Sequence, residues 1–152
     1  MEIISLVVLD GLSITHKEYK AYSRFKLLLV DIRDRQLTDV VIGFINDQVK
    51  LVNHAINNKF EVQKVIRSAQ KTILSMLEKE LKLVCKNHYQ SRWMAIGMLV
   101  FGIPIGFAYN NMMGNVSGIG MGIAIGIGAG IAIGSSLDKK AEKEGRQLNI
   151  TL

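Results

Sequence analysis

The sequence predicts an all-α protein in which a helical N-terminal domain precedes a two-helix hairpin that crosses a membrane. Two patterns lead to this fold class. Residues 93–137 contain no Asp, Glu, Lys or Arg, although 21% of the whole chain is charged. Before that stretch, apolar residues recur every three or four positions, which is the period of an amphipathic helix. The chain therefore divides into a cytosolic domain at 1–92, a transmembrane hairpin at 93–137 and a basic cytosolic tail at 138–152.

An apolar run at residues 3–9 opens the chain and is closed by Asp10 and Gly11. Because the run is so short, its pattern fits a strand, a buried turn of helix or a segment lying on a membrane. It lacks the basic start and the long apolar core of a secretory signal, so we expect residues 1–92 to stay in the cytosol. The single cysteine, Cys85, excludes a disulfide framework and fits a reducing compartment.

Three amphipathic helices are predicted in the N-terminal domain, each with a capping residue at its start. The first begins at Thr15, where Glu18 stands three residues later as in a capping box. Thr38 can cap the second helix, and Asn58 with Glu61 repeats the cap spacing before the third. Their apolar stripes are Tyr19, Tyr22, Phe25, Leu28, Leu29 and Ile32; Val41, Phe44, Ile45, Val52, Ala55 and Ile56; and Val62, Val65, Ile66, Ala69, Ile73, Met76, Leu77, Leu81 and Val84.

The third helix meets no Pro or Gly before Gly97, which allows it to continue through Tyr89 and Trp93 into the membrane. The three helices together are near the lower size limit for a stable solitary core. Self-association, or docking on a membrane, would add to the stability of this domain.

The uncharged stretch is long enough for two membrane spans and a turn, because one span needs about 20 apolar residues. We place the first span at 93–109, the turn at 110–115 and the second span at 116–137. The turn is predicted from a cluster of turn-forming residues, namely Asn110, Asn111, Gly114 and Asn115. Trp93 and Tyr109 stand at the two ends of the first span, where amphipathic rings anchor a helix at the membrane interface.

Basic residues flank the hairpin on both sides, while the predicted turn carries no charge. The positive-inside rule therefore places both termini in the cytoplasm and the turn on the far side of the plasma membrane. The flanking basic residues are Lys82, Lys86 and Arg92 before the hairpin and Lys139, Lys140, Lys143 and Arg146 after it.

Two glycines of the first span, Gly102 and Gly106, have the GxxxG spacing that lets helices approach closely. Between them stands Pro104, the only proline of the chain. A proline inside a helix is a candidate kink, which would act as a hinge or simply accommodate packing.

The second span carries two columns of small residues, which predict a glycine zipper. Two positions along a helix correspond to about 200° of rotation, so the two columns lie on nearly opposite faces. Small residues permit close helix packing in lipid, and a helix with two such faces can contact a neighbour on each side and close a ring of identical subunits. Alternatively, one column packs on the first span of the same chain. The columns are Gly118, Gly122, Gly126, Gly130 and Gly134, and Gly120, Ala124, Gly128 and Ala132.

The run from Gly102 to Gly134, followed by the charged residues after Asp138, resembles the C-terminal region of bacterial glycine-zipper family proteins. The resemblance covers about a third of the chain, and it implies an inner-membrane protein whose helices pack through glycines, without implying an activity. The second span is also similar to the inner helix of rotary ATPase c-subunits and to the pore helix of small-conductance mechanosensitive channels. Neither span has the ion-carrying carboxylate of a c-subunit, so ion-coupled rotation is not expected.

The sequence has no pattern typical of an enzyme, a cofactor site or a metal site. Cys85 and His88 form one C-x-x-H pair, whereas zinc needs about four ligands, and His16 and His54 are isolated. The glycines do not lead into the Gly-Lys-Ser/Thr ending of a phosphate-binding loop. We therefore expect no catalytic residues, no metal and no cofactor.

The formal net charge of +6 is spread among acidic residues and lacks aromatic or glycine interleaving, so no nucleic-acid partner is expected. The pair Arg33 and Arg35 is either part of a solvated charge run or a polar contact between protomers.

Three functions fit the sequence. The first is a homo-oligomeric pore, or a membrane-permeabilising effector, gated by the cytosolic helices. The second is a non-conducting anchor that recruits a cytosolic protein partner to the lipid bilayer. The third is a soluble helical regulator that buries the glycine-rich hairpin in its own core. The three differ in what covers the apolar residues of 93–137.

Overall fold

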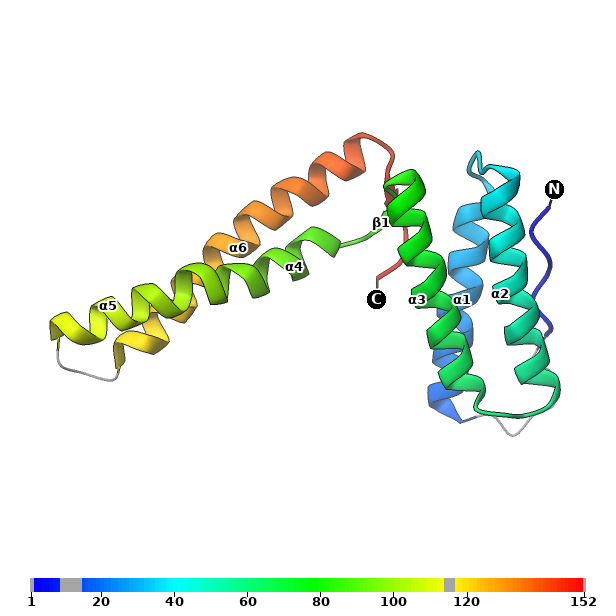
Figure 1. The fold of residues 1–152 in the computed structure, drawn as a ribbon, viewed down its shortest axis with the longest axis horizontal. Helices are drawn as coiled ribbons and strands as arrows, with labels where there is room; N and C mark the ends of the chain where they lie inside the picture. Colours follow the sequence, from blue (N-terminus) through cyan, green and yellow to red (C-terminus); the bar gives the residue numbers. More distant parts are fainter. Residues whose placement is uncertain (1, 9–14, 114–116, 152) are drawn as a thin grey trace. The chain divides into compact units, whose positions relative to one another are not determined.

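The computed structural model describes residues 2–8, 15–113 and 117–151, and these residues are mostly helical (Figure 1). The chain separates into two compact units. Unit 1 comprises Met1–Val84 with Leu148–Ile150, and unit 2 is formed chiefly by Cys85–Gln147. The prediction of a mostly helical chain is confirmed. Two helices are long and apolar enough to cross a membrane.

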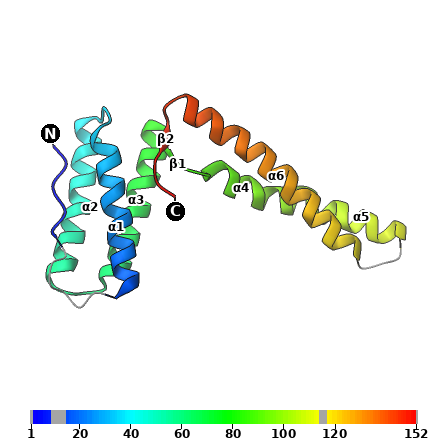
Figure 2. The ribbon, with the colours of Figure 1, turned by 180° about the vertical axis from the view of Figure 1, so that it is seen from behind.

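Unit 1 is built on three helices, α1 (His16–Arg33), α2 (Asp39–Asn57) and α3 (Val62–Leu81). They lie side by side, and α3 packs against both α1 and α2 (Figure 1, Figure 2). Tyr19 is an exception to the predicted stripes, since it lies near the helix start and is 61% exposed. The core consists of large side chains that are almost completely buried, including Phe25, Leu28, Ile32, Ile45, Val49, Val52, Ile66, Ile73 and Leu77.

The predicted capping box at the start of α1 is confirmed. The backbone N–H of Thr15 donates to the Glu18 carboxylate (2.9 Å), and the Glu18 N–H donates to the Thr15 hydroxyl oxygen (3.4 Å). The prediction for Asn58 is wrong, because its side-chain amide donates to the C=O of His54 (2.9 Å) and so ends α2. The α3 helix is preceded instead by Glu61, whose φ of 39° is left-handed.

The third helix does not continue into the apolar stretch, contrary to the sequence analysis. It ends at Lys82, which adopts a φ of 54°, and the N–H of Leu83 bonds back to the C=O of Leu77. The next three residues are all buried, so the chain leaves the helix in order to place Leu83 and Val84 in the core of unit 1. Burial of these side chains, rather than a Pro or Gly, ends the helix.

Two strands of two residues each follow from this break. β1 (Val84–Cys85) pairs with β2 (Gln147–Leu148) in a two-stranded sheet. Leu148 of β2 and Ile150 are buried in unit 1, and the N–H of Asn149 donates to the Asp31 carboxylate (2.9 Å). Leu148 and Ile150 of the predicted basic tail are therefore part of the core of unit 1.

Unit 2 is a hairpin of two long rods that lie side by side (Figure 1, Figure 2). The first rod consists of α4 (His88–Gly97), a π-helical turn η1 (Met98–Gly102) and α5 (Ile103–Met113). The second rod is α6 (Ser117–Lys143).

Both rods are longer than the spans predicted from the sequence. Asn110 and Asn111 continue α5 instead of forming the turn, and the predicted turn residues Gly114 and Asn115 lie outside the described residues. At the other end, α6 runs past Leu137 to Lys143.

Candidate functional site

The five glycines of the first small column, here called the inner stripe, face the backbone of the first rod. A methyl group built on Gly122 would overlap the backbone of Gly102 and Gly106, and one built on Gly126 would overlap that of Gly97 and Gly102. No side chain separates the two helices at these points. The inner stripe consists of Gly118, Gly122, Gly126, Gly130 and Gly134, whose facing residues are Asn110, Gly102 with Gly106, Gly97, Trp93 and Gln90 respectively.

The π turn keeps three glycines of the first rod on one face. Gly97 and Gly102 are five residues apart, so in a regular α-helix they would not share a face with Gly106. The Ile103 N–H bonds to the C=O of Met98, five residues back, which widens this turn by one residue. Pro104 has no N–H and its ring crowds the preceding turn, which gives a physical reason for the widening. The candidate kink at Pro104 is thus a change of helical register.

The second small column, here called the outer stripe, has no partner among the described residues of the hairpin. A methyl group built on Gly120 or on Gly128 would meet no atom within 4 Å. Ala124 and Ala132 are also exposed. The two columns therefore differ in environment, since one is closed by the first rod and the other is open along the length of α6.

Large apolar side chains cover most of the outside of the hairpin. Only 17% of the most apolar stretch of the first rod is buried, and only 28% of that of the second. Trp93 is half-buried, and Tyr109, the other predicted interface anchor, is 37% exposed. The exposed apolar residues are Met94, Ile96, Leu99, Val100, Phe101, Ile103, Ile105, Phe107, Met112, Met121, Ile125 and Ile133.

Asp138 closes the open end of the hairpin. Its carboxylate is buried and accepts hydrogen bonds from the backbone N–H groups of Tyr89 (3.0 Å) and Gln90 (2.9 Å), in the first turn of α4. A negative charge at a helix N-terminus is favourable, because the first N–H groups of a helix have no partner within it. Nearby, a hydrogen bond to Glu144, followed by one to Tyr89, raises the pKa of Arg146.

Residues 2–8 of unit 1 form neither a strand of a sheet nor a helix, and they lie along α2 (Figure 1). Two asparagines of α2, Asn46 and Asn53, hydrogen-bond to the backbone of this segment. Tyr22 of α1 donates its hydroxyl proton to the C=O of Val7 (3.0 Å). None of the three conformations considered from the sequence describes this arrangement, in which side chains of two helices bind an extended segment.

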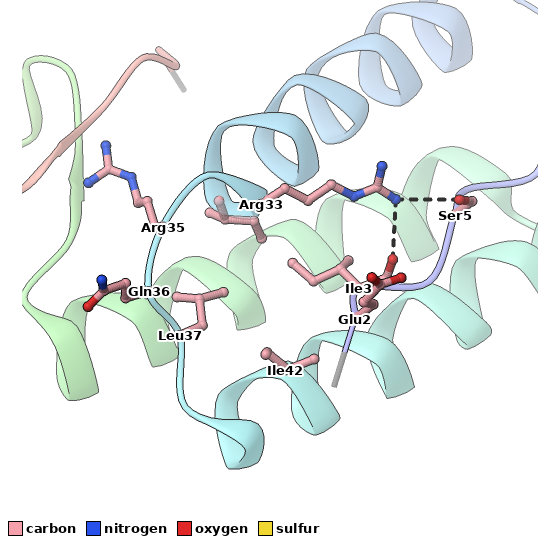
Figure 3. A pocket seen from close by; sticks show the side chains of 9 residues that line it. Glu2, Ile3, Ser5, Arg33, Arg35, Gln36, Leu37 and Ile42 are labelled. Carbon is pink, nitrogen blue, oxygen red and sulfur yellow. Dashed lines mark hydrogen bonds between the residues drawn. The ribbon is translucent and has the colours of Figure 1, made fainter.

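A cavity of 630 Å³ adjoins this segment, between its first residues and the α1–α2 connection (Figure 3). Arg33 reaches across to donate to the C=O of Ile3 (3.2 Å) and to the Ser5 hydroxyl (3.4 Å). Arg35 lies on the opposite side of the cavity in Figure 3, and its guanidinium is 4.0 Å from the Asp31 carboxylate. Arg33 is exposed to solvent, as in a solvated charge run, and it also hydrogen-bonds the N-terminal segment.

Among the residues that the structure describes, no three His, Cys, Asp or Glu side chains come close enough to hold a metal ion. Cys85 is buried and, as the only cysteine of the sequence, forms no disulfide within the chain. His88 lies three residues later at the start of α4, and His16 and His54 lie in unit 1.

The sequence analysis missed several residues that the structure brings into contact. Gly97 was overlooked because a spacing of five to Gly102 fits no α-helical pattern. Asp138 was counted only as the first charge after the apolar stretch. Asn46 and Asn53 carry a signal that was available, since two amides seven residues apart lie on one face of a helix.

Comparisons with models of protein families, with curated proteins and with solved structures find no match to this chain.

Proposed function

We propose that this chain is an integral membrane protein whose hairpin crosses the bilayer and self-associates, and that the oligomer permeabilises the membrane. The observation that carries the proposal is the inverted hairpin, in which glycines are buried while large apolar side chains are exposed. A soluble protein rarely exposes so large a continuous apolar surface to water, because the burial of apolar area is its main source of stability. Lipid is the solvent that suits this surface.

The length of each rod fits a bilayer. A helix of 27 residues, such as α6, is about 40 Å long, whereas the hydrocarbon core is about 30 Å thick. The chain leaves unit 1 at Val84 and re-enters it at Leu148. We therefore place both ends of the hairpin, and with them unit 1, on the cytoplasmic side, in agreement with the basic flanks.

Self-association is assigned to the outer stripe. The inner stripe already packs on the first rod of the same chain, so a glycine-zipper contact with a second copy is left to the outer stripe. That stripe consists of Gly120, Ala124, Gly128 and Ala132. If two outer stripes meet each other, the contact closes as a dimer. A ring requires the outer stripe of one copy to meet a different face of the next, for which the exposed side of the first rod is the candidate.

The hairpin carries no charged side chain between 93 and 137, so a pore between copies would be an apolar constriction. Such a constriction empties of water and stays closed until it widens. Unit 1 would supply the gating movement, as the part of the chain outside the membrane.

The test is ion leakage from liposomes that contain purified full-length protein. Gly128→Leu should abolish leakage and reduce the mass of the detergent-solubilised particle several-fold, because the leucine fills the outer stripe without disturbing the hairpin. Ile125→Leu is the matched control, since it lies on the same exposed side of α6 but outside the stripe. If liposomes that contain the intact oligomer do not leak ions, the protein does not permeabilise the membrane.

A non-conducting anchor is the second candidate, and the closed inner stripe favours it. A hairpin that satisfies its closest contacts within one chain can hold unit 1 at the membrane without any oligomer. This function predicts that replacing 93–137 by an unrelated transmembrane hairpin preserves the recruitment of a cytosolic partner. Loss of recruitment, with expression and insertion unchanged, would count against the anchor.

A further inference from the structure

The contacts of the N-terminal segment form a repeated pattern on α2. Asn46 accepts from the Ile4 N–H (2.8 Å) and donates to the Glu2 C=O (3.0 Å). Asn53, seven residues further along α2, makes the same pair of hydrogen bonds: it accepts from the Val7 N–H (2.9 Å) and donates to the Ser5 C=O (3.2 Å). Each side-chain amide thus binds the N–H of one residue and the C=O of the residue two before it.

The spacing of the two amides matches the repeat of an extended chain. Seven residues of α-helix rise about 10.5 Å, and three residues of extended chain span about 10 Å. The distance from Ile4 to Val7 along the segment therefore matches the distance from Asn46 to Asn53 along α2, and the segment and the helix run in the same direction. The two amides bind backbone atoms only, so they recognise the conformation of the segment and not its side chains.

Two further residues complete what we call the docking face, which consists of Tyr22, Arg33, Asn46 and Asn53. Tyr22 and Arg33 each donate to a backbone C=O of the segment, at Val7 and Ile3 respectively. Three apolar side chains of the segment are half-buried, namely Ile3, Leu6 and Val7. The ligand that fits this face is an extended peptide with apolar side chains at those positions.

We propose that the docking face is a peptide-binding site, and that residues 2–8 of a second copy of this chain exchange with those of the first as its occupant. A second copy offers the same backbone and the same apolar side chains, so every contact of the segment is reproduced in trans. Exchange of an identical element is a low-cost route to association. The inference concerns unit 1 and does not depend on whether the hairpin conducts.

Local concentration decides between docking within a chain and docking between chains. A short tether gives the segment of the same chain an effective concentration on the order of millimolar. A free peptide below millimolar concentration therefore displaces the chain's own segment poorly. A second copy held beside the first in one membrane presents its segment at a similar local concentration and can compete for the docking face. Exchange should therefore be observed between full-length chains.

The test uses two full-length variants that cannot dock within themselves. Ile4→Pro with Val7→Pro removes both backbone N–H donors from the segment and leaves the docking face intact. Asn46→Leu with Asn53→Leu removes both amides from the docking face and leaves the segment intact. A donor dye is placed at Glu2→Cys of the second variant and an acceptor at Lys50→Cys of the first, both with Cys85→Ala.

We expect energy transfer when the two variants are mixed in detergent and its loss when free peptide of residues 2–8 is added in excess. In the matched controls, donor-labelled and acceptor-labelled molecules of one and the same variant are mixed, with the dyes at the same two positions, because hairpin association contributes equally to all mixtures. Transfer in the complementary mixture that does not exceed the two controls would overturn exchange between copies. Circular dichroism verifies that both variants keep their helices.

A labelled peptide of residues 2–8 tests the site itself on the proline variant. N-methylation of Ile4 and Val7 keeps both side chains and removes both donors, and it should weaken binding about tenfold or more. N-methylation of Leu6, whose N–H lies outside the amide pairs, is the matched control and should leave binding within about threefold. Equal losses for the two peptides, or no binding of the unmodified peptide at millimolar concentration, would overturn the peptide-binding site.

Discussion

The two units are both built from helices but bury opposite kinds of residue. In unit 1 the buried side chains are large, as with Phe25 and Ile73, which are both 0% exposed. In the hairpin the buried positions on the facing sides of the rods are glycines, while Phe107 and Met121 are more than half exposed. Unit 1 therefore gains stability by removing apolar surface from water, and the hairpin packs by bringing backbones together.

With the hairpin in lipid, as proposed, this difference follows from the solvent rather than from helix propensity. Glycine costs about 1 kcal/mol relative to alanine inside a water-exposed helix. In lipid no hydrophobic force brings two apolar helices together, so the close approach that glycine permits becomes the main source of association. The predictions below test each half of this comparison.

The largest expected effect is the loss of the folded hairpin on Gly126→Leu. The leucine would occupy space held by the backbone of Gly97 and Gly102, so the rods must separate, at a cost of at least about 4 kcal/mol. Gly128→Leu, two residues away, should not destabilise the hairpin of a single chain, because its leucine meets no atom there. Unfolding in detergent, followed by the fluorescence of Trp93, the only tryptophan, measures both. Equal destabilisation by the two variants would contradict the assignment of inner and outer stripes.

In unit 1 the reverse change, from large to small, should be the damaging one. Ile73→Ala leaves a cavity in a fully buried site and should cost about 3 kcal/mol. Val40→Ala is the control, because Val40 is 76% exposed and its truncation should cost less than about 0.5 kcal/mol. Urea unfolding of the full-length protein in detergent, followed by far-ultraviolet circular dichroism, gives the two values. If Ile73→Ala were as mild as Val40→Ala, unit 1 would not have a close-packed core.

A smaller effect is expected where the two rods begin and end. Asp138→Ala removes the acceptor for two N–H groups at the start of α4 and should destabilise the hairpin by about 1–2 kcal/mol. Asp138→Asn keeps one acceptor oxygen and should cost less than half as much. Hydrogen exchange at Tyr89 and Gln90 should accelerate in the alanine variant while the middle of α4 keeps its protection. Unchanged exchange at both amides would show that Asp138 is not their cap.

The smallest effect concerns the capping box of unit 1. A hydrogen bond from the Thr15 hydroxyl, and then one from the Thr15 backbone, lowers the pKa of Glu18 below its ordinary value of 4.5. Because the folded-state pKa is depressed, the stabilisation is fully present above pH 4.5 and is lost as the pH falls through the folded-state value. Thr15→Ala should return the Glu18 pKa toward 4.5, as measured by NMR titration. A pKa that is the same in both proteins would contradict this account.

Some of these features were available from the sequence and some were not. The Thr15 capping box was predicted because all its parts lie within four residues. The break after Leu81 was not, because it depends on the burial of Leu83 and Val84 against residues far away in the sequence. The glycine of the first rod nearest its start, Gly97, was missed because its register depends on the π turn.

The helical content, the uncharged apolar stretch and the two columns of small residues can be predicted from the sequence, because each follows from local composition and the period of the helix. The fold was needed to show which column is closed within the chain, because that choice depends on how the first rod lies against α6. It also decided what residues 2–8 do, because their conformation is fixed by Asn46 and Asn53, more than forty positions along the chain. Contacts between distant residues have no local signal, and these contacts separate the two faces of the hairpin and define the docking face.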